Sequence, residues 1–357
     1  MNSPSELNIE QGELPDSVLR QTAALRVPPG FQSPIIAIVG PTASGKSTLA
    51  DALATRLGGE VISADSMQVY RGMDIGTAKT PESERSVPYH CIDLVEPGAI
   101  FTAALYQRYA RLAIDEVSSY RRRVVFCGGT GLYLRAALDH FELDEGREQQ
   151  TNSEFREQMK ARAESLGAIA FHAELAERDP ESAELIHPNN TRRVIRAFEL
   201  LEQGTSYAQS TAGFARFESV YPVRFVGLKV ERELLYQLID ARVNAMIKDG
   251  WLGEVQVLLS EDYGDALRTS QAIGYKEIAL VLEGKMTLRE ANEATRQATR
   301  RYAKRQMTWF NRDPRIEWID VSDLHRRVLD GAINSEDFRF MLLSRAMQLL
   351  NSASAVL

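Results

Sequence analysis

The sequence predicts an α/β protein, in which a parallel β-sheet is flanked by helices and interrupted by an all-helical insertion. Short apolar runs alternate with amphipathic stretches from residue 35 to about 138, a pattern typical of strand–helix–strand units. From about residue 142 to 215 only helical periodicity is found, and a strand-like run returns at 223–229. A chain of 357 residues is long enough to bury such a core and to carry an insertion.

The elements of the core can be assigned in chain order. The first helix ends at Gly58, a usual helix terminator. In the next helix, Leu105, Tyr109, Leu112 and Val117 fall on one face, as in a helix that packs on a sheet. We expect strands at 35–39, 60–64, 124–127, 223–229 and 316–319, and helices at 46–57, 105–120 and 131–138.

Composition changes along the chain suggest four segments. We expect a mobile N-terminal extension at 1–32, an α/β core at 33–141 and 220–322, a helical insertion at 142–219, and a C-terminal helical tail at 323–357. Within the insertion, Asn189 and Asn190 are expected to cap a helix at 191–203 that stops at Gly204. The tail carries an amphipathic helix around 340–350 that can pack on the core, and it is given no function.

Composition and charge exclude several classes of protein. No apolar run approaches the roughly 18 residues of a membrane span, and the N-terminus lacks the pattern of a secretory signal. Cys91 and Cys127 are too few for a disulfide scaffold or a four-ligand zinc site. We therefore expect a cytoplasmic protein with no membrane partner, and a monomer.

Two basic clusters stand out against the net charge of −7. Residues 296–315 carry seven basic side chains and one acid, and Arg192, Arg193 and Arg196 share one predicted helix. Local patches determine where a polyanion binds more than the overall charge does. Such clusters can also be solvated helix faces, and the sequence pattern alone leaves both interpretations open.

The strongest motif is a GxxxxGK[ST] phosphate loop between the first predicted strand and helix. Its glycines let successive backbone N–H groups point at phosphate oxygens, together with the N-terminus of the helix. Lys46 adds a positive charge, and the Ser47 hydroxyl can hold Mg²⁺. The motif predicts a P-loop NTPase-like sheet that binds a di- or triphosphate through Gly40, Pro41, Thr42, Ala43, Ser44, Gly45, Lys46 and Ser47.

The acids near this loop argue against a kinase. P-loop kinases and NTPases generally place a magnesium-binding Asp at the end of a later strand, but the strand at 124–127 ends in Gly-Gly-Thr-Gly. Asp65 instead follows the second strand, and at the carboxyl edge of a parallel sheet it would face the ligand crevice. The alternative is a carboxylate that only stabilises a turn.

Six blocks in the order GPTASGKST, ADSMQVYRGMDIGTAK, GGTGLYLRA, HPNNTRRVIRAFE, IGYKE and RRYAKRQMTWF resemble the tRNA dimethylallyltransferases, also called tRNA isopentenyltransferases. The resemblance runs from about Ile35 to Asp320. It implies transfer of a dimethylallyl group from dimethylallyl diphosphate to the exocyclic amine of adenosine 37 of tRNA, with Mg²⁺ as cofactor. The chain lacks downstream cysteines for a zinc finger and resembles the shorter bacterial form.

By motif position, the resemblance implies three catalytic residues: Asp65 as the general base, and Thr42 and Arg232 near the reacting centre and diphosphate. A carboxylate that accepts the amine proton suits a poor nucleophile. The adenine must leave its stack to reach the donor. The implied tRNA contacts, centred on the anticodon stem-loop, are Asp65, Ser66, Met67, Gln68, Thr130, Arg156, Arg192, Arg193, Val194, Ile195, Arg196, Gln271, Ala272, Ile273, Gly274, Tyr275, Lys276, Lys304, Arg305, Gln306, Met307, Thr308, Trp309, Phe310 and Asn311.

Three alternative functions remain open: prenylation of free adenine nucleotides, a small-molecule kinase, and RNA binding without catalysis. The first does not need the basic clusters, the second needs the missing late-strand acid, and the third leaves the phosphate loop unexplained. The chain also departs from the family pattern at Tyr89, where a His is usual, and at Asn311, where a basic residue is common. Both positions lie away from the expected chemistry.

Overall fold

A computed structural model describes residues 34–140, 143 and 153–352. The chain divides into two compact units, residues 1–139 with 219–357 and residues 140–218. The sequence places the insertion at 142–219, close to the second unit. The expected mobile extension at 1–32 lies outside the described residues.

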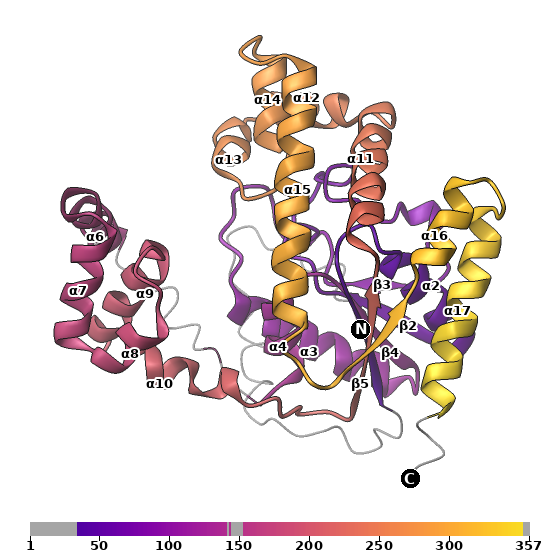
Figure 1. The fold of residues 1–357 in the computed structure, drawn as a ribbon, viewed down its shortest axis with the longest axis horizontal. Helices are drawn as coiled ribbons and strands as arrows, with labels where there is room; N and C mark the ends of the chain where they lie inside the picture. Colours follow the sequence, from indigo (N-terminus) through magenta and orange to yellow (C-terminus); the bar gives the residue numbers. More distant parts are fainter. Residues whose placement is uncertain (1–33, 141–142, 144–152, 353–357) are drawn as a thin grey trace. The chain divides into compact units, whose positions relative to one another are not determined.

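The first unit is built on a six-stranded sheet in which every neighbouring pair is parallel, in the order β3-β2-β4-β1-β5-β6 (Figure 1). This confirms the predicted α/β class. The strands are β1 (Ile35–Val39), β2 (Gly59–Ser63), β3 (Tyr89–His90), β4 (Arg123–Cys127), β5 (Val223–Lys229) and β6 (Ile316–Asp320). The edge strand β3 was not predicted, because two residues are too few to show an alternating pattern.

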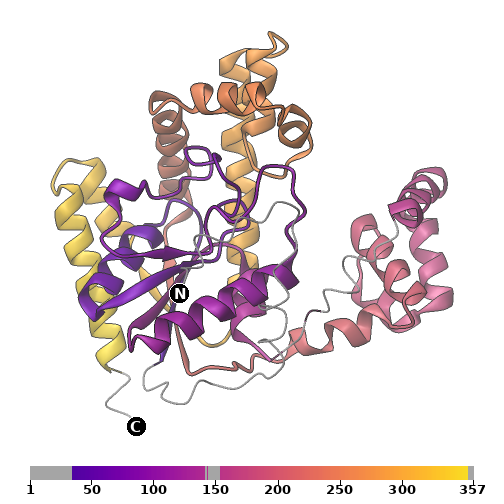
Figure 2. The ribbon, with the colours of Figure 1, turned by 180° about the vertical axis from the view of Figure 1, so that it is seen from behind.

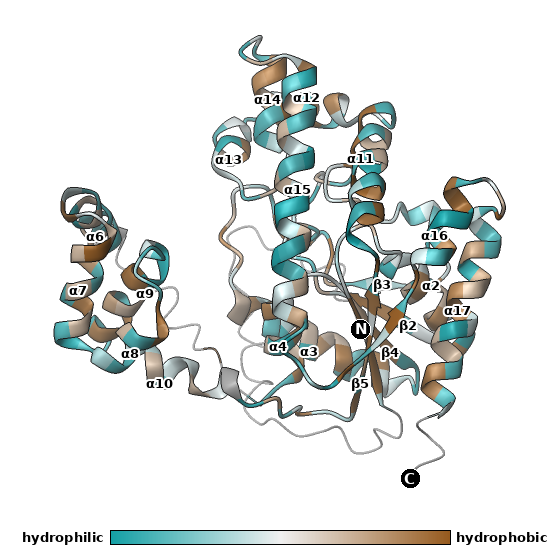
Figure 3. Cartoon of the chain, viewed as in Figure 1, coloured by the Kyte–Doolittle hydropathy of each residue, from teal (hydrophilic) through white to brown (hydrophobic). Residues whose placement is uncertain are grey.

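Helices cover both faces of this sheet. Successive side chains of β1 point to opposite faces, and both sets are buried. Ile35, Ala37 and Val39 pack with α3 (Ala103–Ser119) and α4 (Gly131–Leu138). Ile36 and Ile38 pack with α2 (Lys46–Leu57), α16 (Ser322–Leu329) and α17 (Ser335–Ser352) (Figure 2). The strands between these layers are strongly apolar (Figure 3).

The C-terminal tail is part of this unit and not a separate segment. Phe338, Leu342 and Ala346 recur every four residues along α17 and are buried with α2 and the sheet. The predicted helix at 340–350 is therefore longer at both ends, and α16 was not predicted. The tail follows β6 directly, so its helices complete one face of the sheet.

Five helices connect β5 to β6: α11 (Arg232–Lys248), α12 (Trp251–Ser260), α13 (Gly264–Thr269), α14 (Tyr275–Leu282) and α15 (Leu288–Phe310). Most of them pack on one another, around Trp251 and Tyr275, beyond the carboxyl ends of the strands, whereas the C-terminal end of α15 reaches α4 and the core of the sheet (Figures 1 and 2). The bounds of these five helices were not predicted from the sequence. A readable signal was present, since Thr287 and Glu290 form a capping box that starts α15.

In the second unit, the described residues form helices α6 (Ser153–Leu166), α7 (Ala168–Arg178), α8 (Pro180–Leu185), α9 (Thr191–Glu202) and α10 (Tyr207–Thr211), with short 3₁₀ turns here and at Glu82–Glu84 of the first unit. Their small core contains Phe171, Leu175, Val194 and Phe198. The predicted cap is confirmed, because the Asn190 side chain accepts a hydrogen bond from the Arg193 N–H. Across the described part of both units, no helix combines the length and apolarity required to traverse a bilayer.

Candidate functional site

The phosphate loop lies between β1 and α2, as its motif predicts. Gly40 adopts φ +139, and a Cβ there would come within 2.5 Å of the Leu228 carbonyl oxygen, so no side chain fits. Gly45 precedes α2 with φ +91, a left-handed conformation that favours glycine. The Lys46 ammonium donates to the Pro41 carbonyl at 2.7 Å. The loop is thus folded around its own lysine at the N-terminus of α2.

A cavity of about 240 Å³ opens beside this loop, at the carboxyl ends of β1, β2 and β4. Its lining includes Thr42, Lys46 and Ser47 of the loop and Asp65 after β2. Of the predicted RNA contacts, the cavity also gathers Ser66, Met67, Gln68, Gln271, Ala272, Ile273, Arg305 and Gln306. Expected phosphate and acceptor residues therefore share one space, although they come from distant parts of the chain.

Asp65 both stabilises a turn and lines the cavity. Its Oδ1 accepts a hydrogen bond from the Met67 N–H at 2.9 Å, which is the turn role, while the residue lines the cavity. Removal from bulk water raises the pKa of its carboxyl, and the Met67 N–H and Lys46 partly oppose that rise. Burial likewise lowers the pKa of Lys46 to about 8. A carboxylate with a raised pKa in a cavity is suited to accept a proton near neutral pH.

The structure places a different arginine from the predicted one at the cavity, and the role of Arg232 stays a prediction. Arg232 does not line the cavity: its guanidinium donates to the Tyr236 hydroxyl at an exposed position. Arg242, nearly three turns further along α11, lines the cavity instead. Burial lowers the pKa of Arg242, and Asp65 opposes that shift through its charge. Arg232 is the first residue of α11 and its side chain is exposed, whereas Arg242 lies on the part of the helix that lines the cavity.

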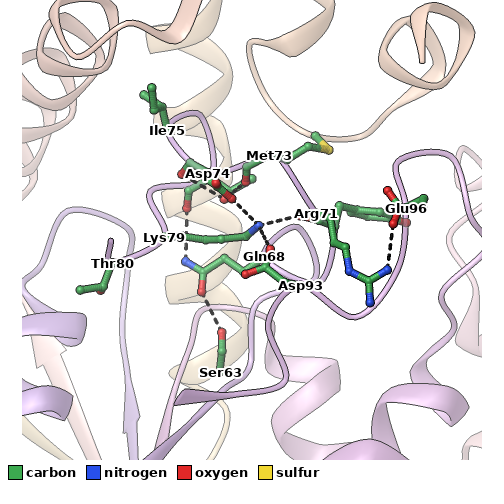
Figure 4. Close-up of polar contacts among 12 residues, drawn as sticks. Ser63, Gln68, Arg71, Met73, Asp74, Ile75, Lys79, Thr80, Asp93 and Glu96 are labelled. Carbon is green, nitrogen blue, oxygen red and sulfur yellow. Dashed lines mark hydrogen bonds and ion pairs between the residues drawn. The ribbon is translucent and has the colours of Figure 1, made fainter. Parts of the chain in front are cut away.

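The segment after Asp65 forms one wall of the cavity and is held by its own side chains. Ser66 N–H donates to the hydroxyl of Thr130 at 3.0 Å, so Thr130, which follows β4 in the chain, supports this wall. The Gln68 amide accepts from the Ser63 hydroxyl at 2.8 Å and donates to the carbonyls of Thr77 and Ala78 (Figure 4). Gln68 therefore closes the segment into a loop.

Lys79 anchors the same segment through its ammonium group. Its side chain is only 3% exposed, and its ammonium binds the carboxylates of Asp74 and Asp93 and the Tyr70 carbonyl (Figure 4). A buried ammonium needs such partners to offset the loss of water. The contacts of Lys79 are those of a supporting residue.

The far side of this wall is tied to α12 and α14 through Glu254. Its carboxylate accepts hydrogen bonds from the N–H groups of Asp74, Ile75 and Gly76 and from the Tyr275 hydroxyl. Tyr275 is fully buried, and its place among the RNA contacts stays a prediction. Trp251, a neighbour of Tyr275, lines the cavity. Neither Glu254 nor Trp251 was identified from the sequence.

Helix α15 passes the cavity and touches the phosphate loop. Gln306 is buried, accepts from the Thr42 N–H at 2.8 Å and donates to the Gly129 carbonyl at 3.1 Å. Phe310 is buried in the core, although its motif predicts an RNA contact. Trp309 packs partly against that core, beside Gly131. Exposed positions of the predicted RNA segments are Gln271, Lys276, Lys304, Arg305, Thr308 and Asn311, and partly exposed ones are Ile273 and Met307, whereas Ala272 and Gly274 are buried. The helix is largely hydrophilic (Figure 3).

In the second unit, α9 carries the predicted arginines. Arg192 and Arg193 are exposed. Arg196 and Arg156 share the buried carboxylate of Glu199, which Arg156 binds through two hydrogen bonds at 2.6 and 3.0 Å. Val194 and Ile195 are buried in the core of this unit. The helical period turns their side chains inward while Arg192 and Arg193 face solvent, and their place among the RNA contacts stays a prediction.

The cavity offers oxygen ligands suited to Mg²⁺. The hydroxyl of Ser47 and the carboxylate of Asp65 both line it, and Mg²⁺ usually needs only one or two protein oxygens when a substrate phosphate supplies others. A dedicated cage is not present among the described residues, where no group of three acidic, His or Cys side chains could hold a metal. The donor set fits a metal that arrives with a phosphate compound.

Comparisons with known proteins identify the family of this chain. The IPP transferase family model matches residues 68–313. A tRNA dimethylallyltransferase 2 of Geotalea uraniireducens is 44% identical over 304 residues, which is 84% of this chain and 96% of the relative. The tRNA dimethylallyltransferase of Bacillus subtilis is 42% identical over 82% of this chain and 92% of the relative.

Two solved structures are similar in fold as well as in sequence. A full-length tRNA isopentenylpyrophosphate transferase from Bacillus halodurans has a TM-score of 0.61 and 37% identity, covering 91% of this chain and 99% of that one. A eukaryotic dimethylallyltransferase, captured acting on tRNA, has a TM-score of 0.69 and 29% identity, covering 83% of this chain and 76% of that one.

Proposed function

The chain belongs to the IPP transferase family, and we propose that it transfers a dimethylallyl group from dimethylallyl diphosphate to the exocyclic amine of adenosine 37 in tRNA. The observation that carries the proposal is one cavity lined by a phosphate loop and by Asp65. A phosphate-binding side and a buried base within one space are what an alkyl transfer from a diphosphate requires.

The donor diphosphate lies on the phosphate loop, where Lys46 and Arg242 face the cavity. As the bond from the allylic carbon to the diphosphate oxygen breaks, negative charge develops on the leaving diphosphate. Two cationic side chains and the loop N–H groups stabilise that charge more in the transition state than before it. The adenine nitrogen forms the new bond to the same carbon and passes a proton to the Asp65 carboxylate, so charge and atoms balance.

Magnesium would be held at the Ser47 hydroxyl. When bound with the donor, Mg²⁺ supplies further charge neutralisation to the diphosphate. The chain itself still has to orient the adenine, and Ser66 and Gln68 on the wall next to Asp65 suit that role. Thr42 lines the cavity on the loop side, consistent with a place near the reacting carbon.

The anticodon stem-loop would bind through basic and polar side chains that reach the surface. Arg192 and Arg193 in the second unit, and Lys304 and Arg305 on α15, are exposed. Phosphate contacts of this kind fix the RNA in place, and the flipped base then enters the cavity.

The test is to incubate the protein with Mg²⁺, dimethylallyl diphosphate and unmodified tRNA, and to analyse the digested nucleosides by mass. One added dimethylallyl group on adenosine, absent when AMP replaces tRNA, is the expected result. Product on AMP would instead indicate a free-nucleotide prenyltransferase, and phosphate transfer from ATP would indicate a kinase. Asp65→Asn should lower kcat about 10²- to 10⁴-fold while donor binding is kept.

A further inference from the structure

We infer that the C-terminal helices α16 and α17 are a working part of the donor site, with His325 as a positioning residue for the phosphate loop. The inference rests on the proposed function, because it takes the loop as the diphosphate site. The tail lies beyond the family-model match, which ends at residue 313.

The contact is a hydrogen bond to the loop backbone. His325 on α16 is buried, and its Nε2 lies 3.3 Å from the Ser44 carbonyl oxygen. Since a carbonyl oxygen can only accept, Nε2 must carry the hydrogen. The Ser44 hydroxyl is buried and makes no hydrogen bond among the described residues. The backbone carbonyl is therefore the polar group that fixes Ser44.

This bond determines where the next N–H points. The carbonyl of Ser44 and the N–H of Gly45 belong to one trans peptide unit, in which the two groups point in opposite directions. A donor on α16 that holds the carbonyl therefore turns the Gly45 N–H away from α16. In a phosphate loop the backbone N–H groups are the anion ligands, so His325 orients one of them.

Packing holds the same peptide from the side of α17. A Cβ on Gly45 would lie 3.2 Å from two ring atoms of Phe338 and 3.5 Å from Leu342, so these side chains lie against the glycine. The His325 and Phe338 rings are themselves in contact, with centroids 4.8 Å apart. None of the three side chains lines the cavity. They can influence the donor only through the loop.

Helix α17 is also held to α2 and α16 by ion pairs that do not involve the loop itself. Arg339 binds Asp51 on α2 at 2.8 Å, and Arg345 binds Asp323 and the Asp320 carbonyl. A control substitution therefore has to avoid these ion pairs and lie at an exposed position of the same helix, such as Glu336.

The experiment measures the affinity of the full-length protein for inorganic diphosphate with Mg²⁺ by calorimetry, and the KM values for donor and tRNA. His325→Ala should weaken diphosphate binding and raise donor KM about tenfold, as loss of one oriented hydrogen bond predicts, with tRNA KM unchanged. His325→Gln, whose amide can still donate, should recover most of the loss. Glu336→Gln, at an exposed position in the first turn of α17, is the matched control and should leave diphosphate affinity unchanged.

Two results would overturn the inference in distinguishable ways. If wild type binds diphosphate and His325→Ala binds it equally well, the tail does not position the loop and the proposed function stands. If wild type does not bind diphosphate, the loop is not the donor site, and both conclusions fail. Should His325→Ala not fold, Phe338→Leu, which keeps the site apolar, provides the same comparison with a smaller loss expected.

Discussion

Glu254→Ala removes the carboxylate that joins the acceptor wall of the cavity to α12 and α14. That carboxylate accepts from Ile75 N–H and the Tyr275 hydroxyl at 2.6 Å each, from Asp74 N–H at 2.9 Å, and from Gly76 N–H at 3.3 Å. Hydrogen bonds to a charged group contribute about 1.5–3 kcal/mol each. The longest bond is weak, and the Asp74 N–H can return to water.

Counting mainly the two short bonds, we expect the free energy of unfolding of the first unit to fall by about 3 kcal/mol. Glu254→Gln keeps the size and one acceptor oxygen but loses the charge, so about half of that loss is expected. Because the segment with Gly76 and Thr77 lines the cavity, substrate must then order it, and tRNA KM should rise about tenfold. Donor affinity should not change.

Urea unfolding followed by tryptophan fluorescence measures the stability, since Trp251 lies in the same cluster. Glu261→Gln is the matched control: it is an exposed glutamate at the end of the same helix, and less than about 0.5 kcal/mol should be lost. An equal loss in the control, or a stable Glu254→Ala protein with normal tRNA KM, would refute the role given to this carboxylate.

Three further predictions concern charge. Arg242→Ala should remove about 2 kcal/mol of charge-assisted donor binding and so raise donor KM strongly, while Arg232→Ala should have little effect. Steady-state kinetics of the two variants measure this, and a larger rise in donor KM for Arg232→Ala would restore Arg232 to the site. The pH profile of kcat/KM should fall on the acid side, as Asp65 with its raised pKa becomes protonated. It should also fall on the alkaline side through about pH 8, as Lys46 loses the proton that diphosphate binding needs. Lys46→Arg should remove the alkaline fall, and a profile unchanged in this variant would contradict the role given to Lys46. Arg193→Ala should weaken tRNA binding and reduce the slope of log affinity against log salt by about one, measured by filter binding, whereas an unaltered slope would exclude a phosphate contact.

The α/β class, the phosphate loop and the cap at Asn190 were readable from the sequence because each depends on neighbouring residues. Alternating apolar runs predict strands, a glycine spacing predicts a backbone turn around phosphate, and an Asn before a helix satisfies its first N–H groups. The placement of Asp65 at the carboxyl edge of its strand was predictable for the same reason.

The burial of each predicted site residue depends on contacts between distant segments. A motif marks Tyr275, Phe310 and Val194 as members of an RNA-binding block, but only packing shows that these side chains are buried. Arg232 and Arg242 lie on one helix, and the sequence cannot tell which of them faces the cavity until α11 is placed against the sheet.

The sequence by itself determined the local chemistry of this protein: which residues can bind phosphate, accept a proton or carry positive charge. Only the tertiary structure decided which of them meet. Glu254 supports a loop about 180 residues away in the chain, and His325 holds a carbonyl 281 residues before it. Such pairings are stabilised by the burial of whole helices, so no local pattern encodes them.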